Sequence, residues 1–179
     1  MKQQNLLKLM MFFLFVTNTG FNLAQPVVTA RFGGECQGEK ILISKPLSKL
    51  IQGQKLRTEI SCNDSSCDDV FVHDLNGDKR PEYFIRLNCG ATGNCTWGVF
   101  SDRPAKMQGQ FSAWFFYLHK TKDRWARIST YTRIGGDSGV IGKLTYHQGQ
   151  YRVQSKRVEN GTFNNPQPYL KKMGVPKCN

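Results

Sequence analysis

The sequence predicts a mainly β domain of the β-rich α+β class. We expect a small antiparallel meander of hairpins, stapled by disulfides and accompanied by one or two short helices. Short runs rich in β-branched and aromatic residues recur from residue 70 onward, separated by clusters of Gly, Asn, Asp and Ser. Six cysteines, an even number, are spread over a chain of 179 residues, which is typical of exported, disulfide-stabilised domains.

The earliest part of the expected domain has the weakest pattern. Residues 25–57 show no sustained period apart from a short helix predicted from Pro46 to Ile51. Proline suits the first turn of a helix, and Gly53 is expected to end this one. A second helical turn is expected near Leu170, in a tail that carries several prolines.

Strands follow along the rest of the chain. They are expected at residues 70–73, 83–87, 96–100, 111–119, 124–133, 140–147 and 151–157. Short turns join these strands, so consecutive strands are expected to pair antiparallel. In strand 111–119 the period of two predicts that Trp114 and Phe116 face the core while Phe115 and Tyr117 face the other side. If both faces are covered, the strand offers no exposed aromatic platform.

Residues 1–24 have the pattern of a secretory signal peptide. Lys2 and Lys8 lie at the start, followed by a short apolar run and a polar stretch. The apolar run is shorter than the roughly 20 residues that cross a bilayer, which favours a cleaved signal over a membrane anchor. Residues 25–179 are then expected to form a single secreted or periplasmic β-rich domain, without a transmembrane segment after cleavage.

The cysteines are expected to form three disulfides. The expected pairs are Cys62 with Cys67, Cys89 with Cys95, and Cys36 with Cys178. The first two pairs each close a short loop rich in turn-forming residues, which lets the ends meet, and the third is left by elimination. Neither short pair has the two-residue gap typical of zinc ligands, which favours disulfides over a zinc site.

The chain is strongly basic. Its formal charge is +12 at pH 7, and loss of Lys2 and Lys8 with the signal would leave +10. Such a surplus favours anionic partners such as an acidic surface glycan or nucleic acid, although scattered charges are also typical of a solvated face. If the surplus serves recognition, strand 124–133 is expected to dominate. By the period of two, the candidate polymer-binding residues share one face of it: Trp125, Arg127, Tyr131 and Arg133.

An acidic stretch lies between the first two predicted strands. Residues 74–82 have the sequence DLNGDKRPE, in which oxygen-bearing side chains recur at alternate positions. A tight loop of this kind can aim several oxygens at one hard cation, and Ca²⁺ requires several oxygens at once. The stretch therefore predicts a candidate calcium site.

This stretch resembles the cation loop of FG-GAP and VCBS repeats, which occur in integrin-type propellers and in bacterial secreted proteins. The resemblance implies a set of ligands made of the side chains of Asp74, Asn76, Asp78 and Glu82 and the backbone carbonyl of Arg80. The sixth position of the family's loop is usually Gly, and here it is Lys79. A propeller needs several copies of the repeat, whereas this chain carries the motif once.

A hairpin without a cation is the alternative for this stretch. Asn76 and Gly77 would then supply the turn, and the carboxylates would accept hydrogen bonds from backbone amides, as in Asx turns. Lys79 and Arg80 offset part of the negative charge that would attract a cation.

These features predict a secreted or periplasmic, non-enzymatic binding or structural domain, with calcium as its candidate cofactor. No catalytic residue is assigned. One alternative is a basic module that binds an anionic surface polymer. The other is a hydrolytic enzyme, which would need two carboxylates in a cleft, as in glycoside hydrolases. A pocket with converging polar groups would favour the enzyme, and a flat basic face would favour the polymer binder.

Overall fold

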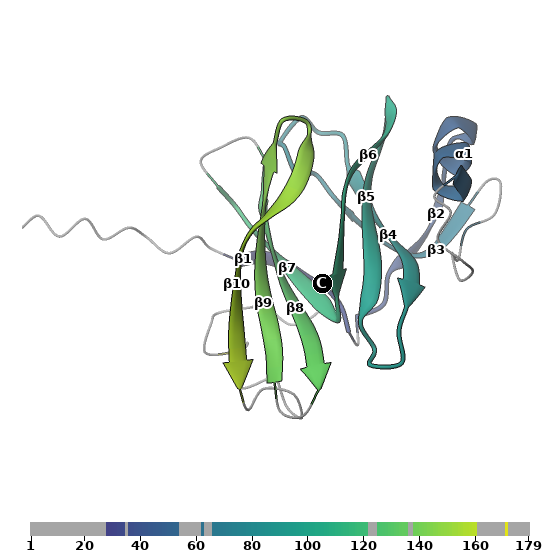
Figure 1. The fold of residues 1–179 in the computed structure, drawn as a ribbon. Helices are drawn as coiled ribbons and strands as arrows, with labels where there is room; N and C mark the ends of the chain where they lie inside the picture. The colour runs from purple at the N-terminus through teal and green to yellow at the C-terminus, as the bar shows by residue number, and fades with distance from the viewer. Residues whose placement is uncertain are drawn as a thin grey trace, which may run out of the picture.

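Figure 1 shows the computed structural model, which describes residues 28–34, 36–53, 62, 66–121, 125–135, 138–160 and 171. Within these residues, the chain forms two five-stranded antiparallel sheets and one helix. The first sheet has the order β1 (Val28–Gly33), β7 (Phe115–His119), β8 (Arg127–Gly135), β9 (Ser138–His147) and β10 (Gln150–Asn160). The second has the order β2 (Glu39–Leu42), β3 (Ser66–His73), β4 (Glu82–Cys89), β5 (Cys95–Asp102) and β6 (Ala105–Ala113). The predicted mainly β fold of antiparallel hairpins is confirmed.

The main core contains side chains from both sheets. It is rich in aromatic residues, because strands from each sheet contribute large side chains to it at alternate positions. The centroid of the Phe84 ring lies 4.7 Å from that of Phe116 and 5.7 Å from that of Phe32. Burying a side chain of this size stabilises a fold by about 2 kcal/mol. These contacts join β1 and β7 of one sheet to β4 of the other.

Helix α1 (Lys45–Gly53) covers the outer face of the second sheet, as Figure 1 shows. Leu47 and Ile51 are four residues apart, so they lie on one face of the helix and are fully buried. They belong to a second apolar cluster with Ile85 and Phe100 of the sheet. Ser44 caps the helix, since its hydroxyl accepts a hydrogen bond from the amide of residue 47 at 3.2 Å. The predicted helix is confirmed.

Two strands fall in the segment that showed no period. β1 pairs with β7, with Phe32 opposite Phe116, and β2 pairs with β3. β2 has only four residues, so it is too short to show a clear alternation. β7, the partner of β1, lies far along the chain, and no local sequence pattern predicts a pairing between such distant segments.

The strand predicted at 111–119 is divided at Trp114. β6 ends at Ala113 in the second sheet and β7 begins at Phe115 in the first. The predicted shared face of Trp114 and Phe116 is therefore wrong, because the break between the sheets interrupts the alternation. Trp114 packs instead against Phe115 and Tyr131, at ring distances of 5.5 and 6.2 Å. Every residue from Phe115 to Leu118 is buried, so β7 offers no exposed aromatic platform.

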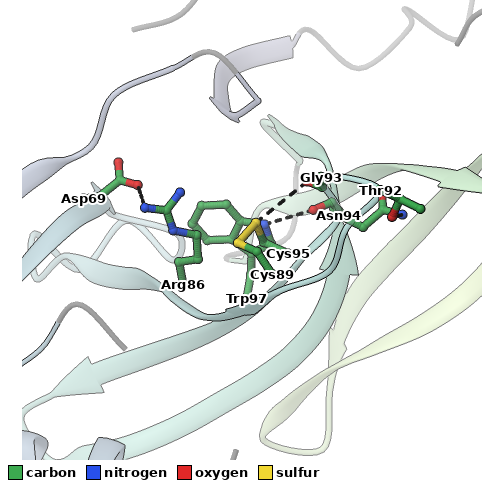
Figure 2. Close-up of a disulfide and its surroundings, with 9 residues drawn as sticks. Asp69, Arg86, Cys89, Thr92, Gly93, Asn94, Cys95 and Trp97 are labelled. Carbon is green, nitrogen blue, oxygen red and sulfur yellow. Dashed lines mark hydrogen bonds and ion pairs between the residues drawn. A yellow bond between two sulfur atoms is a disulfide. The ribbon is translucent and has the colours of Figure 1, made fainter. Parts of the chain in front are cut away.

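Two of the predicted disulfides are confirmed, Cys62–Cys67 and Cys89–Cys95. Figure 2 shows the second of these, which joins the end of β4 to the start of β5 where the two cysteines face each other in register. An ion pair between Arg86 and Asp69 links β4 to β3 nearby. The even number of cysteines and their turn-rich spacing were thus sufficient to predict both bonds.

Cys36 is also disulfide-bonded, and its predicted partner Cys178 lies outside the described residues. The predicted signal at 1–24 lies outside them as well. Of the helical turn predicted near Leu170, only residue 171 is described, and it is helical. Among the described helical residues, no segment is long and apolar enough to cross a membrane.

Candidate functional site

The acidic loop, residues 74–81, joins β3 to β4 and is held by its own side chains. Asp74 accepts hydrogen bonds from three backbone amides of the loop, those of Asn76 at 3.3 Å, Gly77 at 2.7 Å and Lys79 at 2.9 Å. Asp78 accepts one from the amide of residue 80 at 2.8 Å. These are the Asx-type bonds of the cation-free hairpin.

The turn itself requires two residues in the left-handed region. Gly77 has φ +75° and Lys79 has φ +66°. Lys79 is the sixth residue of the loop, where FG-GAP and VCBS loops usually have Gly. Its positive φ is the backbone conformation that favours Gly at that position. The backbone thus turns as sharply as the resemblance implies, although the residue is different.

Three of the side chains predicted as calcium ligands, those of Asp74, Asn76 and Asp78, form hydrogen bonds within the loop itself. The side-chain oxygen Oδ1 of Asn76 accepts a hydrogen bond from the backbone amide of Asp78 at 2.8 Å. The side-chain nitrogen Nδ2 of Asn76 donates to Asp78 Oδ2 at 3.1 Å. In the described part of the chain, no three His, Cys, Asp or Glu side chains are grouped so that they could hold a metal ion. The arrangement matches the hairpin alternative, and calcium binding by Asp74, Asn76, Asp78, Arg80 and Glu82 stays a prediction.

Glu82 is the exceptional member of this set. It begins β4 and is only 3% exposed, and its Oε2 accepts a hydrogen bond from the Leu75 amide at 2.8 Å. Burial raises the pKa of Glu82 from its ordinary value of 4.5 to about 7. The Leu75 amide opposes this change in pKa, and the nearby charges of Asp78 and Asp74 reinforce it.

A pocket of about 590 Å³ opens beside the acidic loop, and we call it the loop pocket. One side is formed by residues 76 and 78–83, from the loop and the start of β4. The other side is formed by residues 101–104, at the turn between β5 and β6, together with Gln108 and Trp125. Glu82 is one of the residues that line this pocket.

A chain of hydrogen bonds orders one wall of the loop pocket. The Tyr146 hydroxyl donates to Gln108 Oε1 at 2.8 Å, and Gln108 Nε2 donates to the Ser101 hydroxyl at 3.0 Å. Ser101 in turn donates to the carbonyl of Pro104 at 2.9 Å. Because each group is fixed by the next, the wall is formed before any ligand arrives.

Trp125 is held in place by stacking. Its ring lies parallel to that of Tyr146, with centroids 3.7 Å apart and an interplanar angle of 11°. The backbone on either side is tied down as well: the Trp125 carbonyl accepts a hydrogen bond from Thr121, and the Ala126 amide donates to the carbonyl of Leu75. Trp125 therefore presents a rigid aromatic wall to the pocket.

The exposed charges around the loop pocket are mostly basic. Lys79, Arg80 and Arg103 are exposed, and Asp78 is the exposed acidic residue among the lining residues. Asp102 is half-buried and accepts a hydrogen bond from the Ser44 hydroxyl. Glu82 is buried, so the rim carries a net positive charge and the less exposed charged residues of the lining are acidic.

The four residues predicted as a polymer-binding face on strand 124–133 do not form one exposed face. Tyr131 is 1% exposed, and its ring lies over Gly139, where an added Cβ would come within 2.5 Å of it. Trp125 precedes β8, which begins at Arg127, so it does not follow the strand's alternation, and it lines the loop pocket. Tyr131 is therefore not exposed to a polymer, and polymer binding by Trp125 stays a prediction.

The two arginines of that face are half-buried in the first sheet. The Arg133 guanidinium lies over the Trp114 ring, 3.3 Å from its centroid, and the Arg133 backbone exchanges two hydrogen bonds with the Asn94 side chain. Arg127 is half-buried too. Polymer binding by these two residues stays a prediction.

Of the residues that complete the loop pocket, the sequence indicated only Trp125 as a binding residue, and it assigned Trp125 to another surface. Ser101, Asp102 and Arg103 come from one turn, and Gln108 and Trp125 come from two other segments. The Asp-Arg-Pro sequence at 102–104 is a recognisable turn signal, but nothing local indicates that this turn lies beside the acidic loop. The chain matches no protein-family model, no curated protein and no solved structure.

Proposed function

We propose that this protein is an exported, non-enzymatic binding domain that holds a polar ligand in the loop pocket. The observation that carries the proposal is the pocket itself, in which Trp125 and the buried residue Glu82 line one space of about 590 Å³. Pockets for small ligands usually have about 300–1,000 Å³ and combine aromatic walls with a few fixed polar groups.

The order of the walls supports a binding role. Gln108 and Ser101 are each fixed by hydrogen bonds, and Trp125 is fixed by its stacking on Tyr146. A site whose side chains are already immobilised loses little conformational entropy when a ligand binds. Such a site can select a ligand by the pattern of its hydrogen-bonding groups.

The disulfides support the exported location. Such bonds persist in oxidising compartments and are rare in the cytosol. Cys62–Cys67 and Cys89–Cys95 agree with the secretory pattern of residues 1–24. N-terminal sequencing of the protein recovered from an export host tests this part, because the proposal requires a mature chain that starts near residue 25.

An anionic polymer is the second candidate ligand, and the basic rim of the pocket favours it. Lys79, Arg80 and Arg103 are exposed around the opening, where they would meet a chain of negative charges. In this second candidate function, the basic surface that binds the polymer lies at the acidic loop and the β5–β6 turn, and not on β8.

A binding titration of two tryptophan variants tests the proposed function. A panel of soluble saccharide, amino-acid and dipeptide fragments is titrated calorimetrically into the wild type, Trp125→Ala and Trp114→Ala. We expect at least one fragment to bind the wild type saturably and Trp125→Ala to weaken it at least tenfold. Trp114 lies outside the pocket lining, so Trp114→Ala should bind like the wild type. No binding by any fragment, or equal loss in both variants, would contradict the proposal.

A further inference from the structure

We propose that the loop pocket recognises a ligand with a primary ammonium group, which pairs with the Glu82 carboxylate at the buried side of the pocket. The inference rests on the proposed function and names the chemical class of its ligand. The exposed cations of the rim would pair with an anionic group on the same ligand. The proposed ligand is therefore a zwitterionic amine, such as an amino acid, a short peptide or an amino sugar phosphate.

The first argument is the unmet bonding capacity of Glu82. An ionised carboxylate has about four acceptor sites, and the only hydrogen bond from another residue in the described part of the chain is that of the Leu75 amide to Oε2. None of the described side chains forms an ion pair with Glu82 or donates a hydrogen bond to it. A carboxylate buried this deeply without a cation is unfavourable, and a ligand ammonium would supply the missing partner.

The second argument is the set of groups that face Glu82. Asp74 and Asp78 of the acidic loop act on it as negative charges. Burial, reinforced by the charge of Glu82, raises the pKa of Tyr146 of β9 and of Tyr151 of β10, so both phenols are neutral. The two aspartates therefore set the sign of the field around Glu82, and a negative field favours a positively charged ligand.

The third argument is the chemistry of the walls. An ammonium group over the face of a Trp ring is attracted by the ring quadrupole, and Trp125 lines the same pocket as Glu82. One carboxylate and one aromatic face are sufficient for an ammonium group. A metal ion would need several ligands, and the described residues group no three acidic, His or Cys side chains for it.

The fourth argument concerns the rim. Lys79, Arg80 and Arg103 are exposed where Glu82 is buried. A ligand with an amine alone would meet repulsion at this rim before it reached the carboxylate. An anionic group a few bonds from the amine would pair with the rim cations, and this arrangement orients the ligand with its amine inward.

The test compares amines with their acetylated forms. The probes are diglycine, glucosamine 6-phosphate and the N-acetyl derivative of each, titrated calorimetrically into the wild type, Glu82→Gln and Asp68→Asn at pH 8. We expect the free amines to bind the wild type at least tenfold more tightly than the acetylated forms. In Glu82→Gln this preference should disappear. Asp68 is exposed on β3, so Asp68→Asn removes a charge elsewhere and should behave like the wild type.

Each outcome has a defined meaning. If the acetylated probes bind as tightly as the amines, or if Glu82→Gln keeps the preference, the ammonium inference is wrong and the pocket proposal stands. If no probe and no fragment of the larger panel binds the wild type, both proposals are wrong. Glutamine has nearly the same shape and keeps an acceptor for the Leu75 amide, and the melting temperature of Glu82→Gln shows whether the variant is folded.

Discussion

Replacing Glu82 by Gln should stabilise the protein at alkaline pH. The wild-type carboxyl is buried at the start of β4 and has a pKa of about 7 when folded, against its ordinary value of 4.5. Between these two values the folded chain binds a proton that the unfolded chain releases. The contribution of Glu82 to stability is therefore complete below about pH 4.5 and is lost as the pH rises through 7.

The size of this effect follows from the two pKa values. Each pKa unit corresponds to about 1.4 kcal/mol, so a difference of about 2.5 corresponds to about 3 kcal/mol between pH 4.5 and pH 8. The glutamine side chain of the variant does not ionise, and its carbonyl can still accept the hydrogen bond from the Leu75 amide. The free energy of unfolding of Glu82→Gln, relative to the wild type, should rise by about 3 kcal/mol over this range.

Urea unfolding at several pH values measures the difference. Trp97 is 1% exposed in the core, so its fluorescence reports unfolding of both sheets. Burial lowers the pKa of His73 below 6.5, against the opposing charge of Asp74, and this makes stability rise with pH. Subtracting the wild-type value at each pH removes that contribution, because both proteins contain His73.

A constant difference between the two proteins from pH 4.5 to pH 8 would refute the reasoning. It would mean that Glu82 titrates at the same pH in the folded and unfolded chains, and hence that its carboxyl is well solvated. A difference that falls with pH would mean that a cation stabilises the ionised carboxylate, which is the opposite of the environment described above.

Three further predictions concern the loop, the disulfide and the charge. A calcium ion bound by the acidic loop should raise the melting temperature in millimolar calcium relative to chelator, and Asp78→Ala should abolish that response; equal melting would leave the hydrogen bonds alone to hold the loop. Replacing Cys89 and Cys95 by Ser should lower the free energy of unfolding by roughly 2 kcal/mol in urea titrations, since their loop is short; an unchanged value would show that the hairpin needs no staple. If the basic surplus serves polymer binding, retention on heparin should fall steeply with salt and fall further in Arg80→Ser/Arg103→Ser than in variants of the two half-buried arginines of β8; equal retention by all of them would leave the charge a solubility feature.

Local features of the sequence were sufficient for much of the fold. The helix over Lys45–Gly53 could be predicted because its apolar spacing, its proline and its final glycine all lie within one short segment. The hairpin around Asn76 and Gly77, and the short disulfide between Cys89 and Cys95, also depend on neighbouring residues alone. Such features can be predicted because the residues that interact are close in the chain.

The candidate site depended on contacts that no local pattern specifies. The alternation of side chains along a strand predicted the face of β8 on which Tyr131 lies. It did not predict that Tyr131 is buried, with its ring over Gly139 of β9. Alternation across residues 111–119 failed because the chain changes sheets at Trp114. The alternation of residues along a strand predicts which side chains share a face, but it does not predict which other segments cover that face.

The sequence by itself determined most of the strands from residue 70 onward, the helix, two disulfides, the acidic loop and the net charge. Only the tertiary structure placed β1 beside β7, buried Glu82 and brought Gln108 and Trp125 to the acidic loop. The physical reason is the range of the interactions. Hydrogen bonds in turns and helical spacing act between neighbours, whereas burial and the raised pKa of Glu82 arise from segments that meet only when the whole chain has folded.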